Sequence, residues 1–563
     1  MIITAAPAST LRLDATWLDY ALVAIYFLFV LGIGWMARSK VSSSLDFFLS
    51  GRSLPAWVTG LAFISANLGA VEIVGQSANG VQYGVQTMHY FWIGAIPAMV
   101  FLGIVMMPFY YGSKVRSVPE FMLKRFGPGA HLVNSLSFAL AQLLIAGVNL
   151  FLLASVVNAL LGWPLWVTLV IAAVIVLSYI TLGGLSAAIY NEVLQFFVII
   201  AAMLPLTLIG LHQVGGWKGL KANLEPYYFH TWPATQLSGF DNPIISVIGI
   251  TLGLGFVLSF GYWTTNFVEV QRSMAAESLS AARRTPIIGA FPKMFIPLIV
   301  AIPGMVAAVS VTPIMERLAD PTHQAGAEPN QAILYLIRDM MPTGLLGVAL
   351  AGLLAAFMAG MAANISAFNT VFSYDLWQTY VVKDRSDEYY LKVGRYVTIG
   401  ATLIAIFTAL IASNFGNIMD YLQTLFGFFN APLFATFIVG MFWKRMTPAS
   451  GWVGLIVGTG TAVVYWVIAT FGNTSIGFFN LPGQGTAFVA ASLAFAADVI
   501  VSVIVSAFTK PKPEAELVGF VKSVTPKEHL VDESEAALPW YRRTVPLGLL
   551  CLALVIILNI IFA

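Results

Sequence analysis

Charged side chains occur inside long apolar segments of this sequence, where they are unfavourable unless they have a function. Glu72 and Lys293 lie deep within such segments, whereas Glu192 and Asp375 lie near the ends of two others. A charge at the centre of a bilayer costs about 2.5–3.5 kcal/mol on insertion scales. Ionisable groups at such a depth are typical of ion and solute pathways. We therefore expect Glu72 and Lys293 to face one common cavity.

Each of these residues also has a purely structural interpretation. Glu72 and Lys293 could form an ion pair that only holds helices together. Glu192 and Asp375 could extend their carboxylates to the inner membrane interface. Both interpretations stay open at the level of the sequence.

Residue patterns of known enzyme sites are absent from the sequence. It contains no HExxH motif, no nucleophile elbow, no P-loop and no His/Cys cluster with metal-ligand spacing. The protein is therefore not expected to be an enzyme. A passive channel usually needs symmetric subunits around a pore, whereas one long chain with internal halves suits transport by alternating access.

The elements that hold these residues must cross a membrane. Of the 563 residues, 59% are hydrophobic and 10% are charged, and the mean hydropathy is +0.84, whereas soluble proteins carry about 25% charged residues. The net charge of +2 gives no sign of a nucleic-acid surface, and the single cysteine, Cys551, excludes an internal disulfide. The sequence predicts an all-α polytopic protein whose partners are the lipid bilayer and small molecules.

Apolar windows predict about fourteen transmembrane helices. They lie near 17–37, 55–81, 88–111, 129–160, 164–182, 188–212, 243–270, 286–312, 343–380, 391–413, 417–442, 448–471, 485–508 and 544–563. Most of the 28 Lys and Arg residues fall into alternate connecting segments, as expected for cytoplasmic loops. This alternation predicts a multi-pass protein of the plasma (inner) membrane with both termini outside.

Two spans carry glycine and polar residues at mid-depth, which is typical of broken helices in transporters. One covers 62–72, and the other contains Gly253, Gly255, Gly261, Tyr262 and Asn266. Small residues that only allow close helix packing are the alternative. A broken helix in each half predicts two inverted five-helix repeats, at 55–212 and 243–442. Around them we expect an N-terminal accessory helix with an inner loop (1–54), an outer loop (213–242), and C-terminal accessory helices (443–563) with an inner loop at 509–543.

Five short motifs carry a resemblance to a known family. They are Asp46-Phe47-Phe48-Leu49-Ser50-Gly51-Arg52-Ser53-Leu54-Pro55, Ser117-Val118-Pro119-Glu120-Phe121 with Arg125-Phe126, Gly183-Gly184-Leu185-Ser186-Ala187, Gln271-Arg272 with Ala275-Ala276, and Gly440-Met441-Phe442-Trp443-Lys444-Arg445. In this order and spacing the chain resembles the sodium/solute symporters, which include bacterial sodium/galactose and animal sodium/glucose cotransporters. The resemblance covers about 42–510. It implies a leucine-transporter-type core of two inverted five-helix repeats, with a small organic solute as cargo and Na⁺ as the coupling ion.

The resemblance also implies a solute site near the middle of the membrane. Its candidate residues are Asn67, Glu72, Phe91, Tyr262, Lys293 and Gln423. The galactose-transporting members have polar sugar ligands where this sequence has Glu72, Phe91 and, in the third core helix, Ile145. Each buried hydrogen bond lost is worth about 1 kcal/mol. Galactose itself is therefore not expected. A sugar or polyol is favoured, and carboxylate and amino-acid solutes stay open as alternatives.

A sodium site on the first broken helix is implied in the same way. Its candidate ligands are the backbone carbonyls of Ser65, Leu68 and Ala356. At two further positions, where the family has serine hydroxyls, this sequence has Ala359 and Gly360. A hard cation prefers about six oxygen ligands, and alanine and glycine supply no side-chain oxygen. Replacing Ala359 and Gly360 by serine is therefore expected to raise sodium affinity. Glu192 is expected on the inner ion path. The predicted function is sodium-coupled symport, and the alternatives are coupling to a proton on Glu72, uncoupled transport, or solute sensing without flux.

Overall fold

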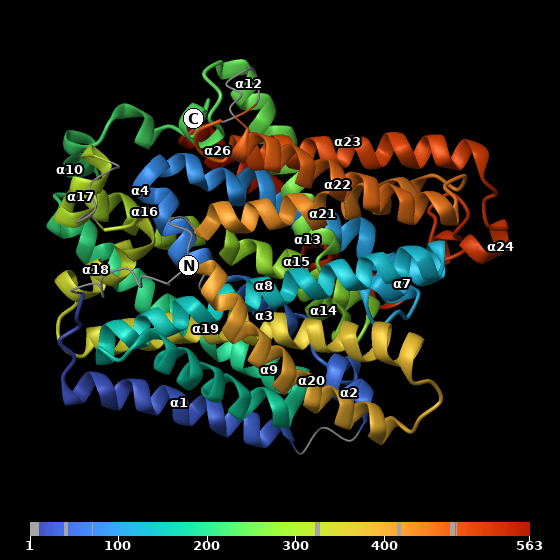
Figure 1. The fold of residues 1–563 in the computed structure, drawn as a ribbon, viewed down its shortest axis with the longest axis horizontal. Coiled ribbons are helices and arrows are strands. Elements are labelled where there is room, and N and C mark those ends of the chain that lie inside the picture. Colours follow the sequence, from blue (N-terminus) through green and yellow to red (C-terminus); the bar gives the residue numbers. More distant parts are fainter. Residues whose placement is uncertain are drawn as a thin grey trace.

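The computed structural model describes residues 11–38, 43–69, 71–320, 327–413, 418–472, 479 and 481–563. In these ranges the chain forms helices and no β-strand, and most of the long helices run side by side (Figure 1). Parts of the predicted segments 1–54 and 62–72, namely residues 1–10, 39–42 and 70, lie outside the described residues. The predicted division into repeats stays a prediction.

Long helices make up most of the bundle. They are α1 (Trp17–Arg38), α8 (Pro128–Leu161), α9 (Leu165–Gln213, with a kink at Gly184), α19 (Leu345–Thr370), α20 (Asp387–Ala412), α21 (Ile418–Phe442), α22 (Pro448–Phe471), α23 (Gly485–Phe508) and α26 (Thr544–Ile561). Shorter helices are α2 (Ser44–Leu49), α5 (Ile96–Phe101), α6 (Met107–Gly112), α7 (Val118–Phe126), α10 (Gly216–Asn223), α11 (Thr235–Ser238), α17 (Thr312–Ala319), α18 (Ala332–Met340), α24 (Glu514–Leu517) and α25 (Glu533–Ala536).

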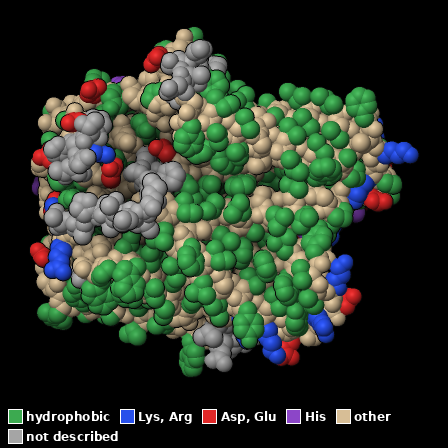
Figure 2. All heavy atoms as spheres, in the orientation of Figure 1, with side chains coloured by type: hydrophobic (Ala, Val, Ile, Leu, Met, Phe, Trp, Pro, Cys, Tyr) green, Lys and Arg blue, Asp and Glu red, His purple; other side chains and the backbone are tan. Residues whose placement is uncertain are grey.

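Twelve helices in the described residues are long and apolar enough to cross a membrane. The bent pair Ala56–Asn67 and Val71–Met88 would be a thirteenth span, and the apolar helix Leu165–Ser178 is shorter than the others. Helix length and composition therefore do not confirm the predicted count of fourteen. Figure 2 shows hydrophobic side chains over the broad middle of the molecule and charged side chains toward its two ends, as a membrane-crossing bundle requires.

The first predicted break is confirmed. α3 (Ala56–Asn67) ends at Leu68, and the chain continues as a π-helical segment (Val71–Gly75) and α4 (Gln76–Tyr83), bent by 55° relative to α3. At position 69 a Cβ would lie 3.2 Å from the Cα of Gly360 on α19, which is closer than an ordinary van der Waals contact. The broken end of α3 therefore approaches the backbone of α19 closely.

The second break lies at Asn266 and not at the glycines that the sequence analysis singled out. α12 (Pro243–Ile248), a π-helical segment (Gly249–Ser259) and α13 (Phe260–Thr265) precede it. Asn266 leaves helical geometry and its side chain accepts from the Val268 N–H at 3.0 Å, which caps α14 (Phe267–Met274). Gly261 instead permits close packing, since a Cβ there would lie 2.8 Å from the Asn430 carbonyl oxygen. For this glycine the packing interpretation is the correct one.

A local irregularity, which the sequence analysis did not predict, lies just after Lys293. α15 (Leu279–Lys293) and α16 (Ile296–Ser310) are separated by Met294 and Phe295, which keep right-handed helical dihedral angles. Pro292 and Pro297 flank this point, and proline removes a backbone donor and clashes with the preceding turn. Leu279–Ser310 is thus one membrane span with a short irregularity beside Lys293.

Glycines bring α16 and α4 into close contact. A Cβ on Gly80 would lie 2.1 Å from the Ala301 carbonyl oxygen, and one on Gly304 would lie 2.0 Å from the Ser77 carbonyl oxygen. Small residues let membrane helices approach to backbone contact. This contact fixes α4, which continues the first broken span, relative to α16.

Replacing Gly304 by alanine is therefore expected to destabilise the protein. Because the methyl group has no space, overpacking should cost about 1–3 kcal/mol and lower the melting temperature of the purified protein in detergent. Gly400→Ala on α20 is the matched control, since nothing lies within 4 Å of a Cβ at that position. Equal melting temperatures for the two variants would contradict the tight contact.

Candidate solute and cation site

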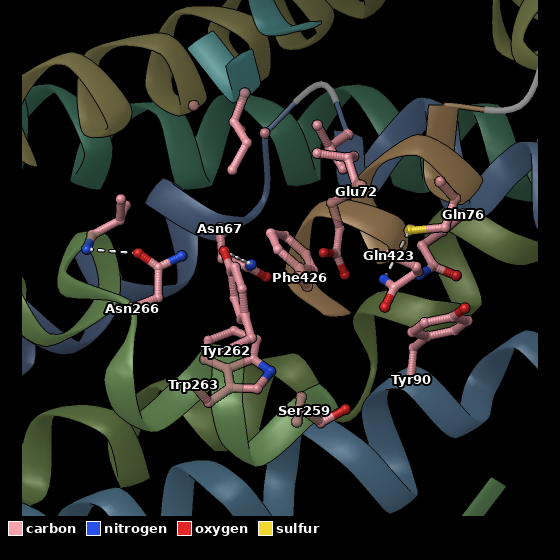
Figure 3. A pocket seen from close by; sticks show the side chains of 18 of the residues that line it. Asn67, Glu72, Gln76, Tyr90, Ser259, Tyr262, Trp263, Asn266, Gln423 and Phe426 are labelled. Atoms are coloured by element: carbon pink, nitrogen blue, oxygen red, sulfur yellow. Dashed lines mark hydrogen bonds between the residues drawn. The ribbon is translucent and has the colours of Figure 1, made fainter. Parts of the chain in front are cut away.

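The broken helices surround one cavity in the interior of the bundle (Figure 3). Its empty space is about 810 Å³ with the openings included. The predicted solute-site residues all line it: Asn67, Glu72, Phe91, Tyr262, Lys293 and Gln423. They come from segments far apart in the sequence, including α3, α13, α15 and α21. Their shared position supports the predicted set, although their role in binding stays a prediction.

Lys293 and Glu72 form an ion pair at this cavity. Lys293 Nζ lies 2.8 Å from Glu72 Oε1, and it also donates to Asn67 Oδ1. Lys293 is 1% exposed and Glu72 is 8% exposed, so neither charge is well solvated. The ammonium group lies 4.9 Å from the ring centroid of Phe91 and 5.2 Å from that of Trp263. The two charges thus face one cavity, as expected, and they are also paired.

Hydrogen bonds extend from this ion pair toward α14. Asn67 Nδ2 donates to the Tyr262 hydroxyl at 3.0 Å, and that hydroxyl donates to Glu269 Oε1 at 2.7 Å. In Figure 3 the side chains of Tyr262 and Asn67 point toward each other, and the Tyr262 ring packs against Phe426 at a centroid distance of 4.6 Å. The sequence analysis missed Glu269, although a carboxylate three residues after Asn266 in an apolar span was a usable signal.

Glu192 and Asp375 lie away from the lining of this cavity. Glu192 on α9 binds Arg272 on α14 at 2.5 and 3.2 Å, and both side chains are fully buried. Asp375 is 3% exposed and lies 2.9 Å from Nε2 of His131 on α8. Neither carboxylate is exposed at the surface, and each has a buried partner within the bundle. The role of Glu192 in the ion path stays a prediction.

Aromatic rings and amide groups make up much of the remaining lining. Residues that the sequence analysis did not name are Gln76, Tyr90, Ser259, Trp263 and Phe426. Figure 3 shows Gln76, Gln423, Tyr90 and Glu72 together at one end of the cavity, and Tyr262 and Trp263 nearer the other. The cavity therefore combines hydrogen-bonding groups with apolar ring faces, and the formal charges of its ion pair cancel.

The predicted sodium ligands lie where the broken end of α3 packs against α19. Ser65, Leu68, Ala356 and Ala359 are fully buried, and Gly360 lines the cavity. The Leu68 N–H donates to the Ile64 carbonyl at 2.7 Å. Ser65 lies in the last turn of α3, where backbone carbonyls lack donors within the helix. Free carbonyls at the end of a broken membrane helix are suited to a coupling cation.

Comparison with known proteins agrees with this arrangement. The profile of the sodium:solute symporter family matches residues 47–458. The sodium/glucose cotransporter of Vibrio parahaemolyticus is 27% identical over 490 residues, which cover 84% of this chain and 88% of that protein. The sodium/myo-inositol cotransporter 2 of Oryctolagus cuniculus is 28% identical over 469 residues, which cover 78% of this chain and 68% of that protein.

A solved structure shares the fold. The outward-open structure of a Na⁺-coupled sialic acid symporter aligns with a TM-score of 0.73 at 21% identity, over 88% of this chain and 99% of that chain. The helical bundle with its broken spans is thus of the leucine-transporter type. The chain belongs to the sodium:solute symporter family, whose members are membrane transporters and not enzymes, with sodium as the coupling ion.

Proposed function

We propose that this transporter uses the inward movement of sodium to take up a small neutral polyhydroxylated solute, a sugar or a polyol. The observation that carries this proposal is the composition of the cavity, which combines ring faces, amide groups and one internally balanced ion pair. The relatives named for glucose and myo-inositol support the same solute class.

Sugars and polyols present apolar C–H faces beside rows of hydroxyl groups. The rings of Phe91 and Trp263 offer apolar surface, and the amides of Gln76 and Gln423 offer both donors and acceptors. An anionic solute would compete with Glu72 for the ammonium group and leave one buried carboxylate unpaired. Breaking a buried ion pair in this way costs about 3–5 kcal/mol. The cavity is therefore better suited to a neutral solute.

Alternating access follows from the position of the broken helices. Asn67 contacts the cavity at the end of α3, and the proposed sodium ligands of the same turn face α19. Sodium and solute would both order this segment, so that each favours the binding of the other. Release would require the Tyr262 hydroxyl to leave Asn67 or Glu269, which it bridges.

Proton coupling through Glu72 and solute sensing without flux are the competing functions. Glu72 is engaged by Lys293 at 2.8 Å, so each protonation would break a buried ion pair. This contact makes Glu72 a poor carrier of a coupled proton. A direct measurement of solute uptake distinguishes transport from solute sensing without flux.

Uptake by the purified protein in liposomes tests the proposal. Labelled glucose and myo-inositol should accumulate with an inward sodium gradient and not with an inward choline gradient, whereas labelled sialic acid, an anionic sugar, should not accumulate. Counterflow without any response to the sodium gradient would contradict symport. Solute accumulation driven by a pH gradient alone would show that the coupling ion is the proton and not sodium.

Glu72→Gln is expected to lower solute uptake per inserted molecule by about tenfold or more, because it leaves the Lys293 ammonium without its counter-ion. The matched control is Glu388→Gln, which breaks an exposed ion pair with Lys392 worth about 0–1 kcal/mol. Initial uptake rates and half-saturating solute concentrations are measured for both. A Glu72→Gln protein with a lower melting temperature but unchanged uptake would favour the purely structural ion pair.

A further inference from the structure

The proposed sodium site lacks the side-chain oxygens of two serines, because alanine and glycine stand at positions 359 and 360. Backbone carbonyls of Ser65, Leu68 and Ala356 alone would leave a hard cation short of the roughly six oxygens it prefers. The side chain of Asn149 on α8 borders the proposed sodium site, because helix α8 packs against α19.

Asn149 is buried with an amide oxygen that lacks a donor. The residue is 2% exposed, and its Nδ2 donates to the Ile145 carbonyl at 3.2 Å, one turn earlier on α8. Within the described residues, Oδ1 has no hydrogen-bond partner. Leaving a buried acceptor unsatisfied costs about 1–3 kcal/mol. A cation at this oxygen would remove that cost.

The amide oxygen lies in the gap between the broken end of α3 and α19. A Cβ on Gly360 would lie 2.5 Å from Asn149 Oδ1. A Cβ on Gly69 would lie 3.3 Å from the same oxygen and 3.5 Å from the Ala356 carbonyl oxygen. The Asn149 oxygen and a predicted sodium ligand therefore border one small space. The amide occupies the room that a side chain at position 360 would need.

We propose that Asn149 Oδ1 is a sodium ligand and replaces the hydroxyl that is missing at position 360. Ser65 adds a second side-chain oxygen, since its hydroxyl is buried and has no partner among the residues that the structure describes. With the carbonyls of Ser65, Leu68 and Ala356, these two groups bring the site close to the preferred oxygen number. This inference rests on the proposed sodium site and adds one ligand to it.

The geometry also bears on the expected effect of serine at positions 359 and 360. A Cβ at position 360 would displace the Asn149 amide, so serine at this position is expected to exchange one oxygen ligand for another rather than to add one. Asn149 and a serine at position 360 are thus alternative sources of one oxygen.

Sodium-dependent stabilisation of the purified full-length protein measures this ligand without transport. The melting temperature is recorded over a NaCl series, with choline chloride holding the ionic strength constant, since a bound ion stabilises the folded protein. Asn149→Ala should raise the sodium concentration for half-maximal stabilisation by about tenfold or more, as loss of even indirect metal partners costs about 10–100-fold. The control Asn134→Ala, on the same helix and equally 2% exposed, should leave it unchanged.

A pair of double variants isolates the oxygen itself. Asn149→Ala/Gly360→Ser and Asn149→Ala/Gly360→Ala differ by one hydroxyl, and only the first should recover sodium affinity. Gly360→Ala alone should displace the Asn149 amide and weaken sodium binding. This single variant tests the same ligand if Asn149→Ala does not fold.

Unchanged sodium affinity in Asn149→Ala, or equal affinities in the two double variants, would overturn the ligand role while leaving the proposed function intact. A wild-type protein with no sodium-dependent stabilisation would overturn both.

Discussion

The buried ammonium group of Lys293 is the constraint on which the centre of this protein depends. Its side chain is 1% exposed in the middle of a membrane-spanning bundle, where an ion is tolerated only with a counter-ion and further polar partners. Glu72 and Asn67 supply these partners from the broken span formed by α3 and α4. α3 ends at Asn67, and the glycine contact between α4 and α16 packs the two spans together.

The broken end of α3 borders both the cavity and α19. Asn67 and Gly69 line the cavity, and Gly69 also approaches the backbone of Gly360 on α19. A segment that has left helical geometry has few internal hydrogen bonds to fix it, so bound ligands can order it. Two ligands that order the same segment are thermodynamically coupled, and the coupling is reciprocal. This arrangement gives a physical basis for linking sodium to solute through one shared segment.

Buried polar contacts also connect the cavity to α14. The Tyr262 hydroxyl joins Asn67 to Glu269, and one turn of helix after Glu269 the Arg272 side chain binds Glu192 on α9. Such contacts are favourable only while each partner stays satisfied. A shift of Asn67 would therefore change the hydrogen bonds that connect it through Tyr262 to Glu269 on α14.

The sequence by itself determined the class of protein, the first broken helix and six residues of the cavity lining. High hydropathy and few charges require membrane-spanning helices, and Glu72 and Lys293 pointed to the cavity because a charge that faces lipid is costly. The tertiary structure decided the remaining features. Gly261 in an apolar span is compatible with unwinding or with packing, and only its contact with Asn430, far along the chain, shows that it packs. The unsatisfied oxygen of Asn149 was likewise invisible in the sequence, because burial and hydrogen-bond partners come from residues that the fold, and not the local pattern, brings together.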